Sequence, residues 1–344
     1  MDWERKSIQV GAAVLCCALV LRLLAGGLWD KLIFAMTSPQ AVSAMLFLET
    51  GRVVRPSGDV PPTETIPTPS EALPTEVPYV EVTLPQEQET PVQAVFSAAD
   101  ASLVEVRSVC GYTADVAGGL AKSLNWDLTA EGPTVLIVHS HGTESYENTE
   151  GYAASSQYRT KDPAYNMISI GDRLVQILEQ GGVKVVHDRV AHDDPSYSDS
   201  YNNSRKSVEN YLKTYPTIRL VLDLHRDAVE DDNGQQLGFS VESEGRKAAR
   251  LMLVVGSDAG GLRHPHWSEN MSLAVKLHAQ LEKNTPGICR PISFRSQRFN
   301  QDLSEGALIV EVGAAGNTRQ EALTAMELLG EAIVDLSHGT VACE

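Results

Sequence analysis

Histidine and glutamate residues end or interrupt three apolar segments of this chain. The segment TVLIVHSHGTES supplies His139 and His141, and Glu144 follows His141 after three residues. The segment RLVLDLHRDA supplies His225, and ALIVEVGA carries Glu311 between two valines. Imidazole and carboxylate groups bind zinc in hydrolytic sites, where a further carboxylate acts as a general base. Together the three segments predict a zinc site with a proton-transfer group beside it.

The context of these residues matters more than their type, because a single histidine at the end of a strand is more often structural than metal-binding. The other histidines lack this context. We therefore predict surface or packing roles for His187, His192, His264, His266, His278 and His338.

Apolar runs and amphipathic segments alternate through the second half of the chain. Strands are predicted at residues 134–139, 183–187, 219–225, 250–255 and 307–312, and helices at 167–180, 204–214, 269–284 and 318–336. Thr318 and Glu321 form a capping-box pattern at the start of the last helix. This order predicts an α/β domain with a largely parallel central sheet covered by helices on both faces. Ligands of such sheets bind beyond the carboxyl ends of the strands, where the histidines and glutamates lie.

The first 30 residues predict a membrane anchor. Residues 8–29 read IQVGAAVLCCALVLRLLAGGLW, an apolar run long enough for one transmembrane helix. Arg5 and Lys6 precede it, which predicts a cytoplasmic N-terminus and an extracytoplasmic remainder. A cleaved signal peptide is the alternative, but the run ends in LAGGLW and not in an A-x-A site. We favour a single-pass protein of the cell membrane.

Residues 31–93 are predicted to link this anchor to a globular domain at residues 94–338. The stretch from Pro56 to Pro91 is rich in Pro, Thr and Glu and poor in large apolar residues, so it cannot bury a core. Such a segment forms an extended tether.

Charge and cysteine content exclude two classes of protein. The formal net charge of −17 opposes nucleic-acid binding, which depends on Lys and Arg contacts to phosphates. Cys110, Cys289 and Cys343 are the cysteines beyond the anchor, and their spacing indicates neither a disulfide framework nor a cysteine zinc site. A single bridge between Cys110 and Cys289 stays open.

The segments HSHGTESY, SYNNSRKSV, LDLHRDA and RFNQDLSEGALIVEVGAAGNTRQEA, in this order, resemble successive motifs of the stage II sporulation protein P family. That family comprises the engulfment peptidoglycan hydrolases of endospore-forming bacteria. The resemblance begins near Val104 and reaches the last helix, and the anchor and linker have the family layout. It implies a fold like that of zinc-dependent N-acetylmuramoyl-L-alanine amidases, which remove stem peptides from glycan, and cross-link endopeptidase activity as well. The implied partners are peptidoglycan, the cytoplasmic membrane, a sporulation lytic transglycosylase and a membrane scaffold protein.

The resemblance also implies roles for single residues. The first zinc-binding His falls on His141, the second on His225, and the catalytic Glu on Glu311. His139 is the alternative to His141, since both lie on the same side if the strand continues.

The carboxylate ligand is less clearly placed. Related amidases place this ligand further from the first His than Glu144 lies from His141. We choose Glu144, with Glu147 and Glu150 as alternatives.

Three polar residues are candidates for substrate binding. Arg205 offers a bidentate fork for a peptide carboxylate, although helix capping explains the polar cluster around it equally well. Asn300 and Gln301 are candidates for binding glycan or peptide amides, although a turn is the simpler explanation.

Two other functions stay open at this point. One is a catalytically silent module that binds or assembles the wall, and the other is a zinc carboxypeptidase. A binding module has no need of a carboxylate placed to deprotonate water, so Glu311 argues against the first.

Overall fold

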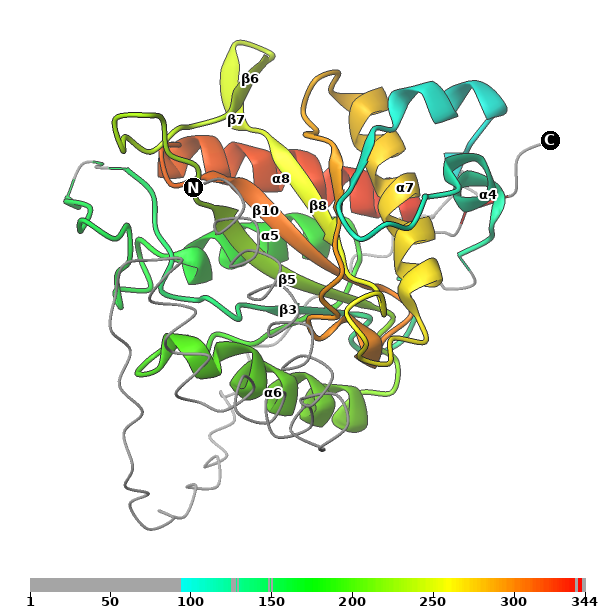
Figure 1. Ribbon diagram of the computed structural model, residues 1–344, viewed down its shortest axis with the longest axis horizontal. Helices are drawn as coiled ribbons and strands as arrows, with labels where there is room; N and C mark the ends of the chain where they lie inside the picture. The colour runs from blue at the N-terminus through cyan, green and yellow to red at the C-terminus, as the bar shows by residue number, and fades with distance from the viewer. Residues whose placement is uncertain are drawn as a thin grey trace, which may run out of the picture. The chain divides into compact units, whose positions relative to one another are not determined.

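A seven-stranded sheet forms the centre of the computed structural model, which describes residues 94–124, 128, 130–147, 149, 151–337 and 340–341 (Figure 1). The strand order is β2-β9-β8-β10-β5-β3-β4. In that order the bounds are Val106–Ser108, Ile292–Phe294, Leu251–Val255, Ala307–Ala314, Leu220–Asp227, Val135–Val138 and Val185–His187. The outlying pairs are the parallel β1 (Ala94–Val95) and β11 (Thr340–Val341) and the antiparallel hairpin of β6 (Ser240–Ser243) and β7 (Arg246–Ala249).

The sheet consists of two parallel blocks. Strands β10, β5, β3 and β4 run parallel to one another, and so do β8, β9 and β2. The two blocks meet at β10 and β8, which pair antiparallel. The prediction of a largely parallel sheet is thus confirmed, with one antiparallel junction that the sequence did not indicate.

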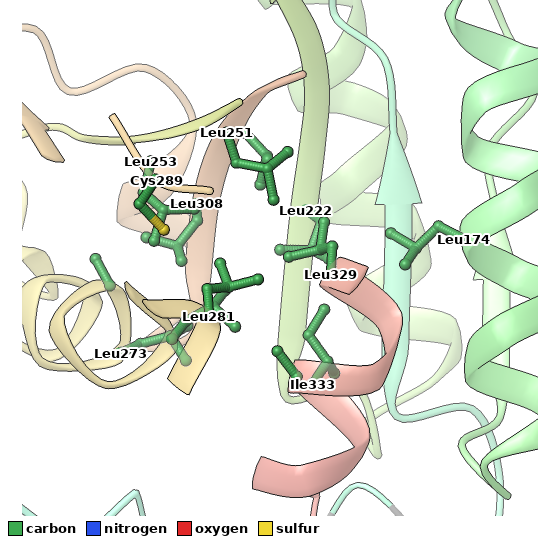
Figure 2. Close-up of a cluster of buried hydrophobic side chains, with 14 of the residues drawn as sticks. Leu174, Leu222, Leu251, Leu253, Leu273, Leu281, Cys289, Leu308, Leu329 and Ile333 are labelled. Carbon is green, nitrogen blue, oxygen red and sulfur yellow. The ribbon is translucent and has the colours of Figure 1, made fainter. Parts of the chain in front are cut away.

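Helices cover both faces of the sheet, as predicted. The helices are α4 (Val116–Ala121), α5 (Met167–Gln180), α6 (Ser200–Thr214), α7 (Trp267–Asn284) and α8 (Arg319–Leu336), with short 3-10 helices η1 (Ala98–Leu103), η2 (Tyr197–Asp199) and η3 (Gln301–Leu303). Helices α5, α7 and α8 bury the larger core on one face, and Figure 2 shows Leu222, Leu251 and Leu308 of the sheet among side chains of these helices. On the other face α6 buries a smaller cluster that includes Val208, Leu136 and Val221.

Alternation along the strands separates apolar from ionisable side chains. Leu222, Leu224, Val310 and Val312 belong to the larger core. Because successive side chains of a strand point to opposite faces, the residues between them point toward the face that α6 covers. These intervening residues are Asp223, His225 and Glu311.

Local signals fix the helix ends. Asn166 caps α5, since its side chain accepts a hydrogen bond from Ile168 N at 3.0 Å. Thr318 and Glu321 form the predicted capping box at α8, with bonds of 3.2 and 2.9 Å between their side chains and backbones. Helix α6 begins at Ser200, ahead of the predicted start, because η2 leads directly into it.

The predicted membrane helix and the linker lie outside the described residues. Within the part of the chain that is described, no helix has the length and apolarity to span a bilayer. Cys110 and Cys289 are free thiols there.

Candidate active site

Three neighbouring parallel strands bring the predicted site residues to one edge of the sheet. In the register of β3 and β5, Val138 pairs with Asp223. In the register of β10 and β5, Glu311 pairs directly with His225. His141 follows the end of β3, so it reaches the same edge.

The two predicted imidazole ligands face each other at this edge. The rings of His141 and His225 lie 5.1 Å apart between centroids and are perpendicular. His225 Nδ1 lies 3.8 Å from Glu144 Oε2. The structure therefore brings together the three residues chosen as ligands, with Glu311 on the adjoining strand.

A tight turn after β3 positions Glu144. Its backbone N–H donates to the carbonyl of His141 at 3.1 Å. Its carboxylate accepts hydrogen bonds from the backbone N–H of Arg226 at 3.1 Å and from the guanidinium of Arg159 at 3.3 Å. The short spacing from His141 to Glu144 is thus compatible with a shared site, because the turn folds the carboxylate back toward β5.

A bulge follows Glu311. The register of β10 against β5 shifts between Glu311 and Ala314. Gly313 has a φ of +64°, and a Cβ there would lie 2.4 Å from the side-chain oxygen of Asn317. Only glycine fits this conformation and this close approach, so the bulge fixes how the strand ends beyond Glu311.

Several polar atoms at this edge are buried without a partner. His141 Nδ1 and Glu311 Oε2 form no hydrogen bond among the described residues. A buried polar atom left unpaired costs about 1–3 kcal/mol. Such a cost in two adjacent catalytic-type side chains indicates a ligand site.

Asp223 is a positioning residue that the sequence reasoning did not assign. Its Oδ1 lies 2.9 Å from His225 Nε2, although the ring N–H is not aimed closely enough at it to form a hydrogen bond. The carboxylate is itself fixed by Ser140, whose N–H and hydroxyl donate to it at 2.8 and 2.6 Å. A carboxylate behind a histidine orients that ring in many metal sites. The available signal was its two-residue spacing from His225.

The environment separates the pKa values of these groups. Burial lowers the pKa of His141 to about 4, against the opposing charge of Glu144. Burial also disfavours the charged form of His225, but the Asp223 and Glu144 carboxylates outweigh it and raise that pKa to about 10. Burial raises the pKa of Glu311 to about 8, opposed by His225 and reinforced by Glu144. A carboxyl group with a pKa near neutrality suits proton transfer.

His139 lies in a different environment from His141. Strand β3 ends at Val138, so the continued strand that would put both rings on one side is not formed. His139 is fully buried, and its Nε2 lies 2.8 Å from His187 Nε2. A Cβ at Gly171 of α5 would come within 2.7 Å of the same nitrogen. The geometry therefore favours His141 as the residue that faces His225.

The alternative carboxylates have no comparable position. The backbone N–H of Glu147 donates to Asn317 O at 3.2 Å. In the described residues no hydrogen bond or ion pair joins its side chain to His141 or His225. Glu150 lies outside the described residues.

Two of the proposed substrate-binding residues have structural partners instead. Arg205 directs both terminal nitrogens at Asp302, with bonds of 2.9 and 3.0 Å, so its fork is occupied. Asn300 donates to Tyr201 O at 2.9 Å and to Ser204 Oγ at 3.0 Å. Both residues hold α6 against the segment before β10, and their role toward substrate stays a prediction.

Gln301 is also held by structural partners, and its role toward substrate stays a prediction. Its side chain is 3% exposed, accepts from Gly256 N at 2.7 Å and donates to Val254 O at 2.8 Å. Both the oxygen and the nitrogen of this side chain are therefore bonded to the backbone at the end of β8.

Two tyrosines line the site: Tyr197, which the sequence reasoning missed, and Tyr201 of the polar cluster around Arg205. The ring of Tyr197 is stacked on His141 at 4.3 Å, and Tyr197 is 57% exposed. The ring of Tyr201 is stacked over His225 at 6.2 Å. Both come from η2 and the first turn of α6, which therefore form an aromatic wall beside the two imidazoles.

The donor types at this edge fit a zinc ion. Two imidazoles and a carboxylate are one ligand set of hydrolytic zinc sites. His141 Nδ1 has no hydrogen-bond partner among the described residues, so its lone pair is free to bind a metal ion. As the side chains stand, no group of three or more His, Cys, Asp or Glu in the described residues is arranged to hold a metal ion. The Glu144 carboxylate is instead hydrogen-bonded to Arg159 and Arg226.

Comparison with known proteins identifies the family. The sequence profile described as stage II sporulation protein P (SpoIIP) matches residues 69–334. The chain belongs to the SpoIIP family. Stage II sporulation protein P of Bacillus subtilis strain 168 is 26% identical over 204 residues, which cover 56% of this chain and 48% of that relative. This SpoIIP chain thus spans about half the length of that relative, and the family indicated by the sequence motifs is confirmed.

Solved structures similar to this SpoIIP chain include three amidases. N-acetylmuramoyl-L-alanine amidase AmiC2 of Nostoc punctiforme is 17% identical, with a TM-score of 0.36, and covers 60% of this chain and 97% of its own. The catalytic domain of CwlV from Bacillus (Paenibacillus) polymyxa var. colistinus is 15% identical, with a TM-score of 0.36, and covers 59% of this chain and 95% of its own. The N-acetylmuramoyl-L-alanine amidase from Clostridium difficile 630 is 17% identical, with a TM-score of 0.34, and covers 60% of this chain and 94% of its own.

Proposed function

We propose that this SpoIIP-family chain is a zinc-dependent peptidoglycan hydrolase that acts in spore engulfment. The bond cleaved is the amide between N-acetylmuramic acid and the L-alanine of the stem peptide. The observation that carries the proposal is the convergence of His141, Glu144 and His225 at one sheet edge, with Glu311 paired directly opposite His225.

Each of these residues has a role in the proposal. His141, Glu144 and His225 would hold zinc, which would supply Lewis-acid polarisation of the scissile carbonyl and a more acidic attacking water. Glu311 accepts the proton of that water and passes it to the leaving amine, and its raised pKa supports this transfer. Asp223 fixes the His225 ring from behind.

Product analysis tests the reaction. Purified peptidoglycan incubated with the full chain is expected to release free stem peptides and leave intact glycan strands. Cleaved cross-links with peptides still attached to glycan would indicate an endopeptidase, and single terminal residues a carboxypeptidase. Binding to peptidoglycan without any release would indicate a silent wall-binding module and contradict the proposal.

Metal analysis tests the zinc site. About one zinc per chain is expected, and His225→Ala should lose most of it, because a catalytic site has only three protein ligands. His278→Ala is the matched control, since this histidine lies on α7, away from the site. Full activity after exhaustive chelation would refute the zinc dependence.

We also propose that residues 1–30 anchor the chain in the cytoplasmic membrane with the hydrolase outside. The apolar run at 8–29 and the preceding Arg5 and Lys6 support this topology. Protease added to intact, wall-stripped cells should remove the hydrolase domain. Complete protection would contradict the topology.

The proposed reaction also defines the kind of partner enzyme. An amidase leaves glycan strands without stem peptides, which is the product that a sporulation lytic transglycosylase would take, and a membrane scaffold protein would hold both at one place. Mixing the two purified enzymes should release more soluble glycan than the sum of each alone. An additive yield would argue against this coupling.

A further inference from the structure

A pocket with a volume of about 520 Å³ lies beside α5 and α8. Its polar lining comes from Ser169, Asp172, Arg173, Gln176, Arg189 and Arg319. None of the residues assigned to hydrolysis lines it. The pocket is therefore a separate site, and the inference drawn from it goes beyond the proposed hydrolysis.

Positive charge dominates this pocket, because three arginines and one carboxylate line it. Arg173 shares the carboxylate of Glu327 with Arg246, at 2.8 and 2.5 Å. The Glu327 charge is thus divided between two guanidinium groups.

The single lining carboxylate is also shared. Asp172 Oδ1 accepts from Arg189 and lies 3.1 Å from His187 Nδ1. Burial lowers the pKa of His187 to about 4, so this ring is neutral and adds no charge. Asp172 therefore balances one arginine at most.

Arg319 has no counter-ion. Its Nε donates to Ser169 Oγ at 3.1 Å, and among the described residues it forms no ion pair. The side chain is partly buried, and burial lowers the pKa of its guanidinium. Removing a cation from water without a partner is costly, so an anion at this position would recover part of that cost.

We propose that this pocket binds a phosphate group of a phosphodiester-bearing wall polymer. Arg319 presents terminal guanidinium nitrogens that bond no other described residue, and these match the several oxygens of a phosphate. Arg173 and Arg189 already bond Glu327, Gln176 and Asp172, so they add positive charge to the same lining. The volume lies in the range of ligand pockets and exceeds that of a lone ion. The chain carries a net charge of −17, so a polyanion is repelled by most of the protein and needs a local cationic site.

Calorimetric titration of the full chain in detergent tests this site with two probes. One probe is an oligomer of glycerol phosphate, and the other is inorganic phosphate. The variants are Arg319→Gln and Arg189→Gln, with Lys206→Gln as the control because it removes the same charge from an exposed position on α6. Saturable binding is expected to weaken by roughly 10- to 100-fold in each pocket variant and to stay unchanged in the control, the usual range for one charged hydrogen-bonding group.

The outcomes separate the possible sources of phosphate. Tighter binding of the oligomer supports a wall polymer, and equal affinity for inorganic phosphate supports the same site but assigns it to the free ion. Absent saturable binding, or equal weakening in Lys206→Gln, overturns the proposal. Arg319→Lys keeps the charge and loses the fork, so a partial loss is expected if Arg319→Gln does not fold. Release of stem peptides from phosphate-free peptidoglycan by Arg319→Gln at the wild-type rate distinguishes this site from the hydrolytic one.

Discussion

The two faces of the central sheet carry different kinds of side chain, although the same strands supply both. Toward α5, α7 and α8, strands β5 and β10 present Leu222, Leu224 and Val310, which are fully buried in the larger core. Toward α6, the alternate positions present His225 and Glu311 at the edge of the sheet. The strands therefore divide into a face that stabilises the fold and a face that carries the candidate catalytic residues.

Two pairs of histidines, His139 with His187 and His141 with His225, differ in a similar way. His139 and His187 bond each other through their Nε2 atoms. His141 and His225 contact each other edge to face, and His141 Nδ1 has no partner. Satisfied rings suit packing, whereas a buried ring with an unsatisfied nitrogen suits a ligand.

The largest expected effect is on the chemical face. Glu311→Gln keeps the shape of the side chain but cannot accept a proton, so hydrolysis should slow by roughly 10²- to 10⁴-fold. Zinc content and melting temperature should stay near those of the wild type. Glu230→Gln, at an exposed position after β5, is the control. Wild-type turnover at normal zinc content would show that Glu311 has no catalytic role.

A core substitution should have the opposite signature. Leu222→Ala leaves a cavity under α8 and should lower the free energy of unfolding by about 2–5 kcal/mol. Its remaining folded fraction should turn over substrate at the wild-type rate, because the side chain points away from the site. Denaturant unfolding and an activity assay on one preparation check both. A rate loss that exceeds the loss of folded protein would break the division between the two faces.

An intermediate effect is expected at Asp223, which reaches the site only through His225. Asp223→Asn removes the charge that orients the ring and should weaken zinc affinity by roughly 10- to 100-fold. Competition with a chelator of known affinity measures this loss. Excess zinc should restore turnover in a positioning variant, and failure to do so would assign Asp223 a more direct part.

The smallest effect is expected at the start of α8. Thr318→Ala removes the side chain that accepts from Glu321 N and should cost about 1 kcal/mol of stability. Thermal melting measures this loss of stability. Thr214→Ala, at the C-terminal end of α6, is the comparison. A change in zinc affinity would show that the helix end is coupled to the site.

The sequence predicted the long elements well because each carries a strong local signal. Helix α5 occupies the predicted residues, and apolar runs mark β3, β5, β8 and β10. The short strands β2 and β9 were missed, since three residues such as VRS and ISF give no alternation to detect. The antiparallel direction of β8 follows from how the chain connects distant segments, which no local pattern records.

The site was predictable where one strand end supplied both residue type and position. His141, His225 and Glu311 were predicted in this way, and the structure places them at one edge of the sheet. Asp223 and Tyr197 were missed because their roles depend on which side chains other strands and helices place beside them. The burial of Gln301 was not predicted, because a polar residue in a turn-like segment indicates exposure, whereas this side chain bonds to the backbone of β8.

The antiparallel junction of β8 and β10 has a practical consequence for attaching reporters to this protein. Because β8 runs opposite to β10, the segment that leaves β8 emerges at the edge remote from His225 and Glu311. Leu262 lies in that segment and is 58% exposed. A fluorophore on a cysteine introduced there, or a short epitope inserted beside it, would report the position of the protein while leaving the edge that carries His225 and Glu311 uncovered.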